Sequence, residues 1–299
     1  MENFSPATPR NLTGEALINL LVQICKKSQI RGMYYLGCQS GVWARLLLRY
    51  LPELRIVGAE ANPFVFVQNH SKLISIDNFS YFNVALSNRC GISTLYLPPL
   101  EPTLVPKNRL DGKLFRSFHA QSVKFREGWR TDATLDSRLL SSSINRKIEV
   151  PTVCLEEFIQ KNPLPRPTLL LSDIQGMELN VLTPFKDNLS NFFDIAFLEI
   201  YPIDPLSGPP HQIPSLMKLN SFSYFANDKL DQHPECYNDL YLSSGLLSKN
   251  AWLENMGIEM DDSINTSNLE KPYLASRFGK SPFRGALLRL LSFFGIKIY

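Results

Sequence analysis

The sequence predicts an α/β fold in which a mostly parallel sheet is covered by helices on both faces. Short β-prone runs alternate with helical stretches along the chain, an order typical of parallel sheets. Two of the runs, residues 168–173 and 193–199, are apolar and end in an acid, as expected for strands buried on both faces. The strand candidates in chain order are residues 33–36, 55–60, 80–86, 168–173 and 193–199.

The helices expected between these strands have recognisable ends. Thr13 can cap a helix over residues 13–27, in which apolar side chains repeat at helical spacing. A second helix is expected over residues 42–50. Asn62 can cap a third helix with Pro63 at its first position, where the missing N–H costs nothing.

The later part of the chain is expected to complete the sheet. A helix over residues 176–182 follows the fourth strand, and residues 222–226 and 240–243 could supply antiparallel strands at one edge. Residues 94–97 and 149–154 could pair as a hairpin.

That hairpin would close an insertion at about residues 98–146, which is rich in proline and basic residues. So long a connection inside a domain is usually functional or disordered. We therefore expect either a mobile cover over the site or a surface insertion. The predicted organisation is an N-terminal segment and helix (1–30), one domain (31–256) and a basic amphipathic tail (257–299).

Composition excludes several classes of protein. A net charge of +3 over 299 residues is too small to indicate nucleic-acid binding by itself. The five cysteines are odd in number and widely spaced, a reduced intracellular pattern without zinc-site spacing, so no metal is predicted. With no signal peptide and no spanning run, we expect a cytoplasmic protein.

The tail allows a further interaction. Residues 271–299 contain six basic residues and no acid, with apolar side chains at helical spacing. Such a helix can lie in a membrane interface. It can equally pack on the domain or mediate self-association, so peripheral membrane contact and packing both stay open.

The first motif with chemical content is residues 37–41 (GCQSG), between the first strand and its helix. Gly37 and Gly41 allow a tight turn and let a ligand approach backbone N–H groups. The spacing is GxxxG and not the GxGxxG of dinucleotide sites. A tight turn without any ligand explains the motif equally well.

Carboxylates stand at the ends of two strands. Glu60 ends the second strand, where a carboxylate can accept both hydroxyls of a ribose; a solvated acid is the alternative. Asp173 ends the fourth strand, and Glu178 follows in the next helix. This pair could orient a nucleophile, act as a base or hold an ion, although an acid in a first helical turn also satisfies backbone N–H groups.

Several segments, in this order, resemble the FkbM family of methyltransferases, over roughly residues 32–245. YLGCQSG (35–41) is similar to the family's D-x-G-A-N-x-G, and GAEANP (58–63) to A-F-E-P-N-P. NVALS (83–87) is similar to N-x-A-L-S, VPTVCLEEF (150–158) to V-x-V-x-T-L-D-x-F, and LSDIQGME (171–178) to K-I-D-V-x-G-x-E.

The resemblance implies a Rossmann-like class I methyltransferase fold that binds S-adenosylmethionine (SAM) and methylates a small-molecule, sugar or lipid-linked acceptor, usually on oxygen. It places Gly37 and Gly41 at the methionine end of SAM, with Gln39 in the position of a family asparagine. It places Glu60 at the ribose and Asn83 beside the adenine. Asp173 and Glu178 would lie beside the acceptor as catalytic residues.

Two positions depart from the family pattern. The first family acid falls on Tyr35, and the family lysine falls on Leu171. Both changes remove a charge, so a non-catalytic binding or scaffold protein with the same fold is the main alternative. A dinucleotide-dependent oxidoreductase is a further one, which the absent third glycine opposes.

Overall fold

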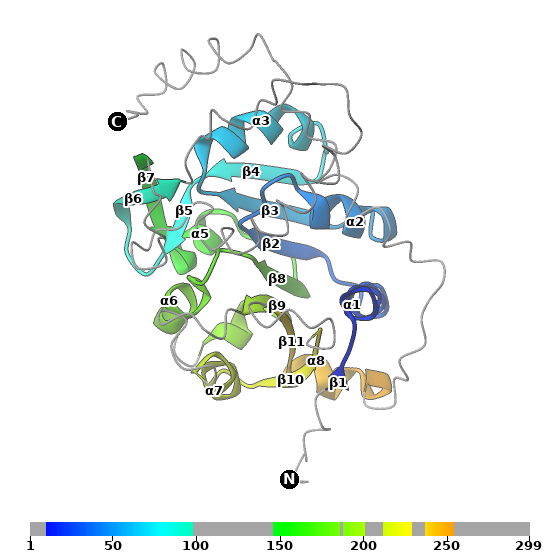
Figure 1. Cartoon of the computed structure of the whole chain (residues 1–299). Helices are drawn as coiled ribbons and strands as arrows, with labels where there is room; N and C mark the ends of the chain where they lie inside the picture. The colour runs from blue at the N-terminus through cyan, green and yellow to red at the C-terminus, as the bar shows by residue number, and fades with distance from the viewer. Residues whose placement is uncertain (1–9, 98–145, 186–187, 201–211, 229–236, 254–299) are drawn as a thin grey trace, which may run out of the picture.

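A computed structural model describes residues 10–97, 146–185, 188–200, 212–228 and 237–253 (Figure 1). The predicted insertion and the predicted tail therefore lie outside the described residues, except for the first residue of the strand at Arg146. The division of the chain into segments stays a prediction.

The predicted α/β architecture is confirmed. A central sheet of eight strands has the order β1-β10-β11-β9-β8-β2-β3-β4. Its strands are β1 (Arg10–Asn11), β2 (Gly32–Leu36), β3 (Arg55–Glu60), β4 (Phe79–Asn83), β8 (Thr168–Ser172), β9 (Ile195–Ile200), β10 (Phe222–Asn227) and β11 (Tyr237–Ser243). The five strands from β9 to β4 run parallel, whereas β11 is antiparallel to both of its neighbours.

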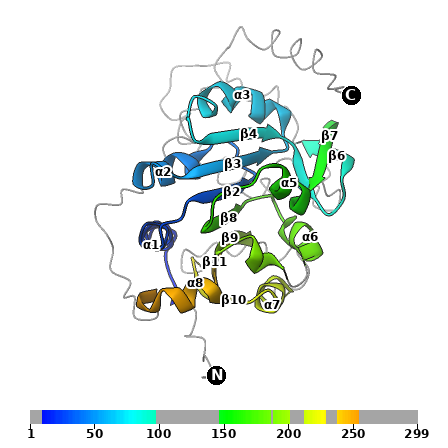
Figure 2. The same ribbon diagram turned by 180° about the vertical axis from the view of Figure 1, so that it is seen from behind.

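Helices cover both faces of this sheet, as predicted (Figures 1 and 2). One face packs against α1 (Gly14–Lys27), α2 (Val42–Tyr50) and α8 (Ser244–Lys249). The other face packs against α5 (Leu155–Lys161), α6 (Glu178–Leu182) and α7 (Gln212–Leu219). The remaining helix, α3 (Pro63–Leu73), flanks β4. Short 3-10 turns occupy Thr183–Phe185, Leu189–Asn191 and Ala251–Leu253.

The alternation of side chains along β2 shows why the sheet is double-sided. Met33 and Tyr35 belong to the apolar cluster on the α1 face, whereas Tyr34 and Leu36 belong to the cluster on the α5 face. All four are nearly fully buried. Successive residues of a strand point to opposite faces, so a strand in the middle of the sheet must be apolar throughout.

Helix ends follow the sequence expectations closely. The Thr13 hydroxyl accepts a hydrogen bond from the Ala16 N–H at the start of α1. The Asn62 side chain accepts from the Phe64 N–H before α3, whose first residue is Pro63. These caps satisfy backbone donors that no helical carbonyl can reach.

Three expectations need correction. The strand predicted over residues 80–86 is two strands. The Val84 N–H still donates to the Glu60 carbonyl of β3, and the chain leaves the central sheet after it, since Ala85 already pairs with β7 (Arg146–Cys154). The chain continues as β5 (Ala85–Ser87) in a separate sheet of order β5-β7-β6, which also contains β6 (Gly91–Leu97). The β6–β7 pair is the predicted hairpin.

The other two corrections concern the start of the helix after β8 and the outermost strand of the central sheet. The helix expected from Gly176 begins two residues later, at Glu178, because Gly176 has a positive φ of 87° and belongs to the preceding turn. The antiparallel pair β10–β11 does not form the sheet edge, since β1 pairs with the outer side of β10.

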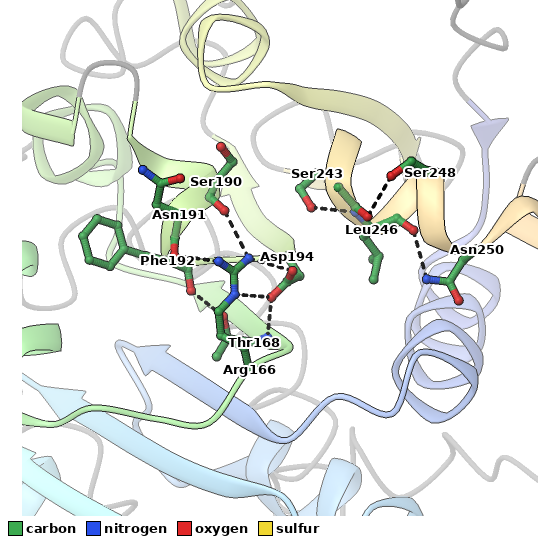
Figure 3. A network of polar contacts seen from close by, with 11 residues as sticks. Arg166, Thr168, Ser190, Asn191, Phe192, Asp194, Ser243, Leu246, Ser248 and Asn250 are labelled. Carbon is green, nitrogen blue, oxygen red and sulfur yellow. Dashed lines mark hydrogen bonds and ion pairs between the residues drawn. The ribbon is translucent and has the colours of Figure 1, made fainter.

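The amino-terminal edge of the sheet is held by paired charge (Figure 3). Arg166 Nε and Nη2 donate to the two oxygens of Asp194 at 3.1 and 2.7 Å. Asp194 also accepts from the Thr168 N–H at 2.8 Å, which joins the starts of β8 and β9.

Among the helices that the structure describes, none combines the length and the apolar character that a membrane span requires.

Candidate functional site

The predicted site residues meet at the carboxyl-terminal edge of the parallel strands. Leu36, the last residue of β2, pairs with Ala59 of β3 on one side and Ser172 of β8 on the other. The loop after β2 therefore lies between the ends of β3 and β8. Glu60 pairs directly with Asn83 at the end of β4. Ligands of open α/β sheets bind outside this edge.

The loop after β2 requires glycine at Gly37. Its φ is +73°, and a Cβ atom there would lie 1.9 Å from the backbone oxygen of Asp173. Gly41, the N-cap of α2, also has a positive φ of 70°, but a Cβ there would meet only the end of the Leu73 side chain. Gly37 thus brings the loop after β2 against the chain leaving β8.

The Glu60 carboxyl holds this loop by hydrogen bonds to backbone N–H groups. Its Oε2 accepts a hydrogen bond from the Gln39 N–H and its Oε1 accepts one from the Asn62 N–H, both at 2.8 Å. Gln39 itself has a positive φ of 40°, a conformation uncommon outside glycine. The Tyr81 hydroxyl donates to the Gln39 carbonyl at 3.1 Å and holds that residue from the β4 side.

Burial of the Glu60 carboxyl raises its pKa to about 7, the Asp173 charge adds to the rise, and the backbone N–H groups of Asn62 and Gln39 oppose it. The side chain is only 6% exposed. A carboxylate oxygen offers about two lone-pair sites, so each oxygen can accept one more hydrogen bond after the backbone contact.

The Asn83 side chain supports the backbone at the end of β3. Its Nδ2 donates to the carbonyl oxygens of Glu60 at 2.7 Å and of Ala61 at 3.3 Å. These contacts hold the end of β3 against the end of β4. The structure therefore brings together all five residues predicted for the cofactor: Gly37, Gln39, Gly41, Glu60 and Asn83.

Asp173 lies at the opposite side of the same loop. Its N–H donates to the Leu36 carbonyl at 3.0 Å, and its Oδ1 accepts from Gln175 Nε2 at 2.7 Å. Gln175 Nε2 also lies 3.4 Å from Oε2 of Glu199 near the end of β9. One amide thus bridges carboxylates from two neighbouring strand ends.

Glu178 differs from Asp173 in its surroundings. It is 2% exposed, and its Oε1 accepts from the Ile174 N–H at 2.8 Å and from the Ser172 hydroxyl at 3.5 Å. Burial raises its pKa to about 8, and the Asp173 charge contributes to this rise. These contacts fit the alternative that Glu178 satisfies backbone donors; its catalytic role stays a prediction.

Sequence reasoning missed Gln175 and Glu199. Glu199 could have been found, because it ends an apolar strand as Glu60 and Asp173 do. Gln175 could not, because its reach depends on a positive φ of 56° in the turn after β8. The two positions that depart from the family pattern, Tyr35 and Leu171, are both buried in the apolar cluster on the α1 face.

No group of three or more metal-ligating side chains was found within the residues that the structure describes. The carboxyl edge instead offers a tight glycine turn, a buried carboxyl with free lone-pair capacity, and a second carboxylate across the loop. That combination suits a ligand with vicinal hydroxyls and a positively charged centre.

The sequence matches the methyltransferase FkbM domain over residues 41–224, more than half of the 299-residue chain. The chain belongs to this family. It is therefore a SAM-dependent methyltransferase. The match begins at Gly41 and includes Glu60, Asn83, Asp173 and Glu178.

Solved structures with distant likeness include other methyltransferases. Precorrin-6y C5,15-methyltransferase from Geobacter metallireducens shares 11% identity, with 82% of this chain and 97% of that chain covered and a TM-score of 0.38. Fibrillarin from Aeropyrum pernix with bound SAM shares 14% identity, with coverages of 77% and 73% and a TM-score of 0.38. An O-methyltransferase from Bacillus cereus shares 11%, with coverages of 77% and 80% and a TM-score of 0.38. No curated protein matches the chain.

Proposed function

We propose that this methyltransferase binds SAM along the ends of β2, β3 and β4 and methylates an oxygen of a small-molecule, sugar or lipid-linked acceptor beside Asp173. The observation that carries the cofactor site is the Glu60 carboxyl, which is buried and uses one lone pair of each oxygen on backbone donors. The remaining lone pairs can accept the two ribose hydroxyls.

The glycine loop supports the same placement. Because Gly37 carries no side chain, the backbone at this residue approaches the end of β8 closely. The N–H groups of residues 37–39 and of Gly41 already donate within the protein, so in our proposal the methionine moiety packs against the backbone of this loop and leaves these bonds in place. Asn83 pairs with Glu60 and so borders the place of the nucleoside. Residues on this edge therefore fit the cofactor at both ends.

When bound, SAM supplies an electrophilic methyl group on a positively charged sulfur. The chain's own residues must position the acceptor and receive its proton. Asp173 is the group best placed for the proton, since it lies across the Gly37 turn from Glu60. Gln175 holds the Asp173 carboxylate by Oδ1, which leaves its other oxygen oriented toward the acceptor side in our proposal.

In this proposal Glu178 influences the acceptor side indirectly, because it holds the turn that carries Asp173. Its Oε1 accepts a hydrogen bond from the N–H of Ile174, the residue after Asp173. Positioning of a reacting group within a fraction of an ångström can decide the rate. Glu178 can therefore support turnover without touching the acceptor.

Calorimetric titration tests the cofactor site. Charge-assisted hydrogen bonds contribute about 1.5–3 kcal/mol each, so Glu60→Ala should weaken SAM binding tenfold or more in a protein that remains folded. Affinity within twofold of wild type would refute the assignment of Glu60.

Asp173→Asn tests the acceptor side. It keeps the shape and removes the charge, so turnover should fall strongly while SAM affinity is mostly retained. An equal loss of both would place Asp173 in the cofactor site. If wild type binds SAM but transfers no methyl group to the small-molecule, sugar and lipid-linked alcohols offered, the proposed oxygen acceptor is contradicted.

A further inference from the structure

Cys90 and Cys154 lie together although 64 positions separate them in sequence. Their Sγ atoms are 2.8 Å apart, and a disulfide bond is about 2.05 Å long. Both are free thiols, Cys90 exposed and Cys154 partly buried. Their spacing matches no cysteine motif, so the pairing could not be predicted from the sequence.

The surroundings of the pair form a compact polar cluster. The Cys90 thiol donates to Oε2 of Glu157 at 2.8 Å, and the Cys154 N–H donates to Cys90 Sγ at 3.2 Å. Glu157 also forms an ion pair with Lys161. Cys90 precedes β6 and Cys154 ends β7, so the thiols stand at the open end of the β6–β7 hairpin beside α5 (Figure 1).

We propose that Cys90 and Cys154 form a reversible disulfide that ties the turn before β6 to the start of α5. The oxidant is a small-molecule disulfide such as oxidised glutathione. The exposed Cys90 thiol loses its proton to water, its thiolate attacks one glutathione sulfur, and the glutathione thiolate that leaves takes up a proton. Cys154 then attacks the Cys90 sulfur, and the second glutathione thiol leaves with the remaining proton.

The remaining described cysteines are unsuited to this reaction. Cys25 and Cys38 are fully buried, and burial raises the pKa of the Cys25 thiol to about 12 and that of Cys38 well above its ordinary value. Thiol exchange needs access and a thiolate. Cys236 lies outside the described residues and is replaced by serine in every variant below.

A disulfide between Cys90 and Cys154 would restrain the elements around it. β5 begins two residues after Asn83, and the Asn88 N–H that follows it donates to the Asn180 side chain on α6. A bond from Cys90 to Cys154 would therefore fix the β5–β6 turn to both neighbouring helices. It would also close a covalent loop around residues 90–154, which restricts the unfolded chain.

Mass spectrometry of the full chain tests the proposal. In a Cys236→Ser background, oxidised glutathione should remove two hydrogens from the mass and yield a cross-linked peptide pair containing Cys90 and Cys154, which dithiothreitol separates. The thermal midpoint should rise by about 5–10 °C on oxidation. Cys90→Ser and Cys154→Ser should abolish both effects, and serine is a favoured N-cap at position 154, so that variant should fold.

Two results would overturn the proposal: a glutathione adduct on Cys90 that never resolves, or thiols that stay reduced under conditions that oxidise an exposed dithiol. Glu157→Gln sharpens the test. The hydrogen bonds to Cys154 and Glu157 raise the pKa of Cys90 to about 11, so removing the Glu157 charge should increase the thiolate fraction and speed oxidation severalfold at neutral pH. An unchanged rate would contradict the effect assigned to the Glu157 charge.

Discussion

Acidic side chains have different hydrogen-bond partners at the amino-terminal edge of the central sheet, where the parallel strands begin, and at the carboxyl-terminal edge, where they end. At the amino-terminal edge, Asp194 receives two hydrogen bonds from Arg166, a positively charged partner (Figure 3). At the carboxyl-terminal edge, the described contacts of Glu60 and Glu178 come from backbone N–H groups and a hydroxyl. Both carboxyls are buried, and both pKa values are raised.

This difference agrees with the proposed division, in which the carboxyl edge binds the cofactor and the amino edge serves stability. A carboxylate with a cationic partner is stable as it stands. A buried carboxylate without one is costly in its charged form and gains most when a positively charged ligand arrives. SAM carries its positive charge on the sulfonium, so the carboxyl edge is suited to it in a way that the amino edge is not.

The largest expected effect is that of Gly37→Ala at the carboxyl edge. The new Cβ would overlap the Asp173 backbone oxygen, and backbone cannot move aside cheaply. We expect a loss of about 3–5 kcal/mol in the free energy of unfolding and loss of SAM binding. Chemical denaturation measures the first and calorimetry the second.

Gly41→Ala is the matched control. Its φ is similar, but the new Cβ would meet only the flexible end of Leu73, so the expected cost is about 1–2 kcal/mol. Equal losses in the two variants would mean that backbone conformation alone, and not the contact with Asp173, makes Gly37 necessary.

Glu178→Gln should change how stability depends on pH. The pKa of Glu178 is raised to about 8 from an ordinary 4.5, so the folded protein holds a proton that the unfolded chain has released, and stability falls as pH rises between these values. Glutamine can still accept from the Ile174 N–H and carries no proton to lose.

The wild type should therefore lose about 2 kcal/mol more than Glu178→Gln between pH 6 and pH 8. Denaturation of the SAM-free protein at the two pH values measures the difference. Glu60 titrates in both proteins and cancels. Parallel pH profiles would show that Glu178 is not protonated in the folded state.

The amino edge should give the smallest effect. Asp194→Ala removes the partner of Arg166 and of the Thr168 N–H. The Arg166 side chain is 45% exposed, so water can replace its lost contacts, whereas the N–H of the buried Thr168 loses its acceptor. We expect a loss of about 1–2 kcal/mol in stability with SAM affinity unchanged. A change in SAM affinity would contradict the division of roles between the edges.

Much of the fold could be predicted, because local patterns control it. The bounds of α2 and β3 agree with the expected ranges, since a strand buried on both faces has a clear sequence pattern and α2 begins directly after the glycine turn. The division of residues 80–86 could not be predicted. The last hydrogen bond from this segment to β3 is donated by the Val84 N–H to the Glu60 carbonyl, and the following residues pair with β7; which strand they pair with depends on contacts between segments distant in the sequence.

The site followed the same rule. Glu60 and Asp173 were predicted because acids at strand ends must meet at one edge of a parallel sheet. The hydrogen bonds that Glu60 already makes to Gln39 and Asn62 depend on loop conformation, and neither they nor the pairing of Cys90 with Cys154 has a signature in the sequence.

The affinity of SAM as a function of pH tests the central claim most directly. If SAM binds the charged form of Glu60, whose pKa is raised to about 7, a proton competes with it below that pH. Calorimetric titration of wild type should then show affinity falling by about tenfold per pH unit below 7 and levelling off above it, with no such dependence in Glu60→Gln. The same pH dependence in both proteins, or none in wild type, would contradict the account.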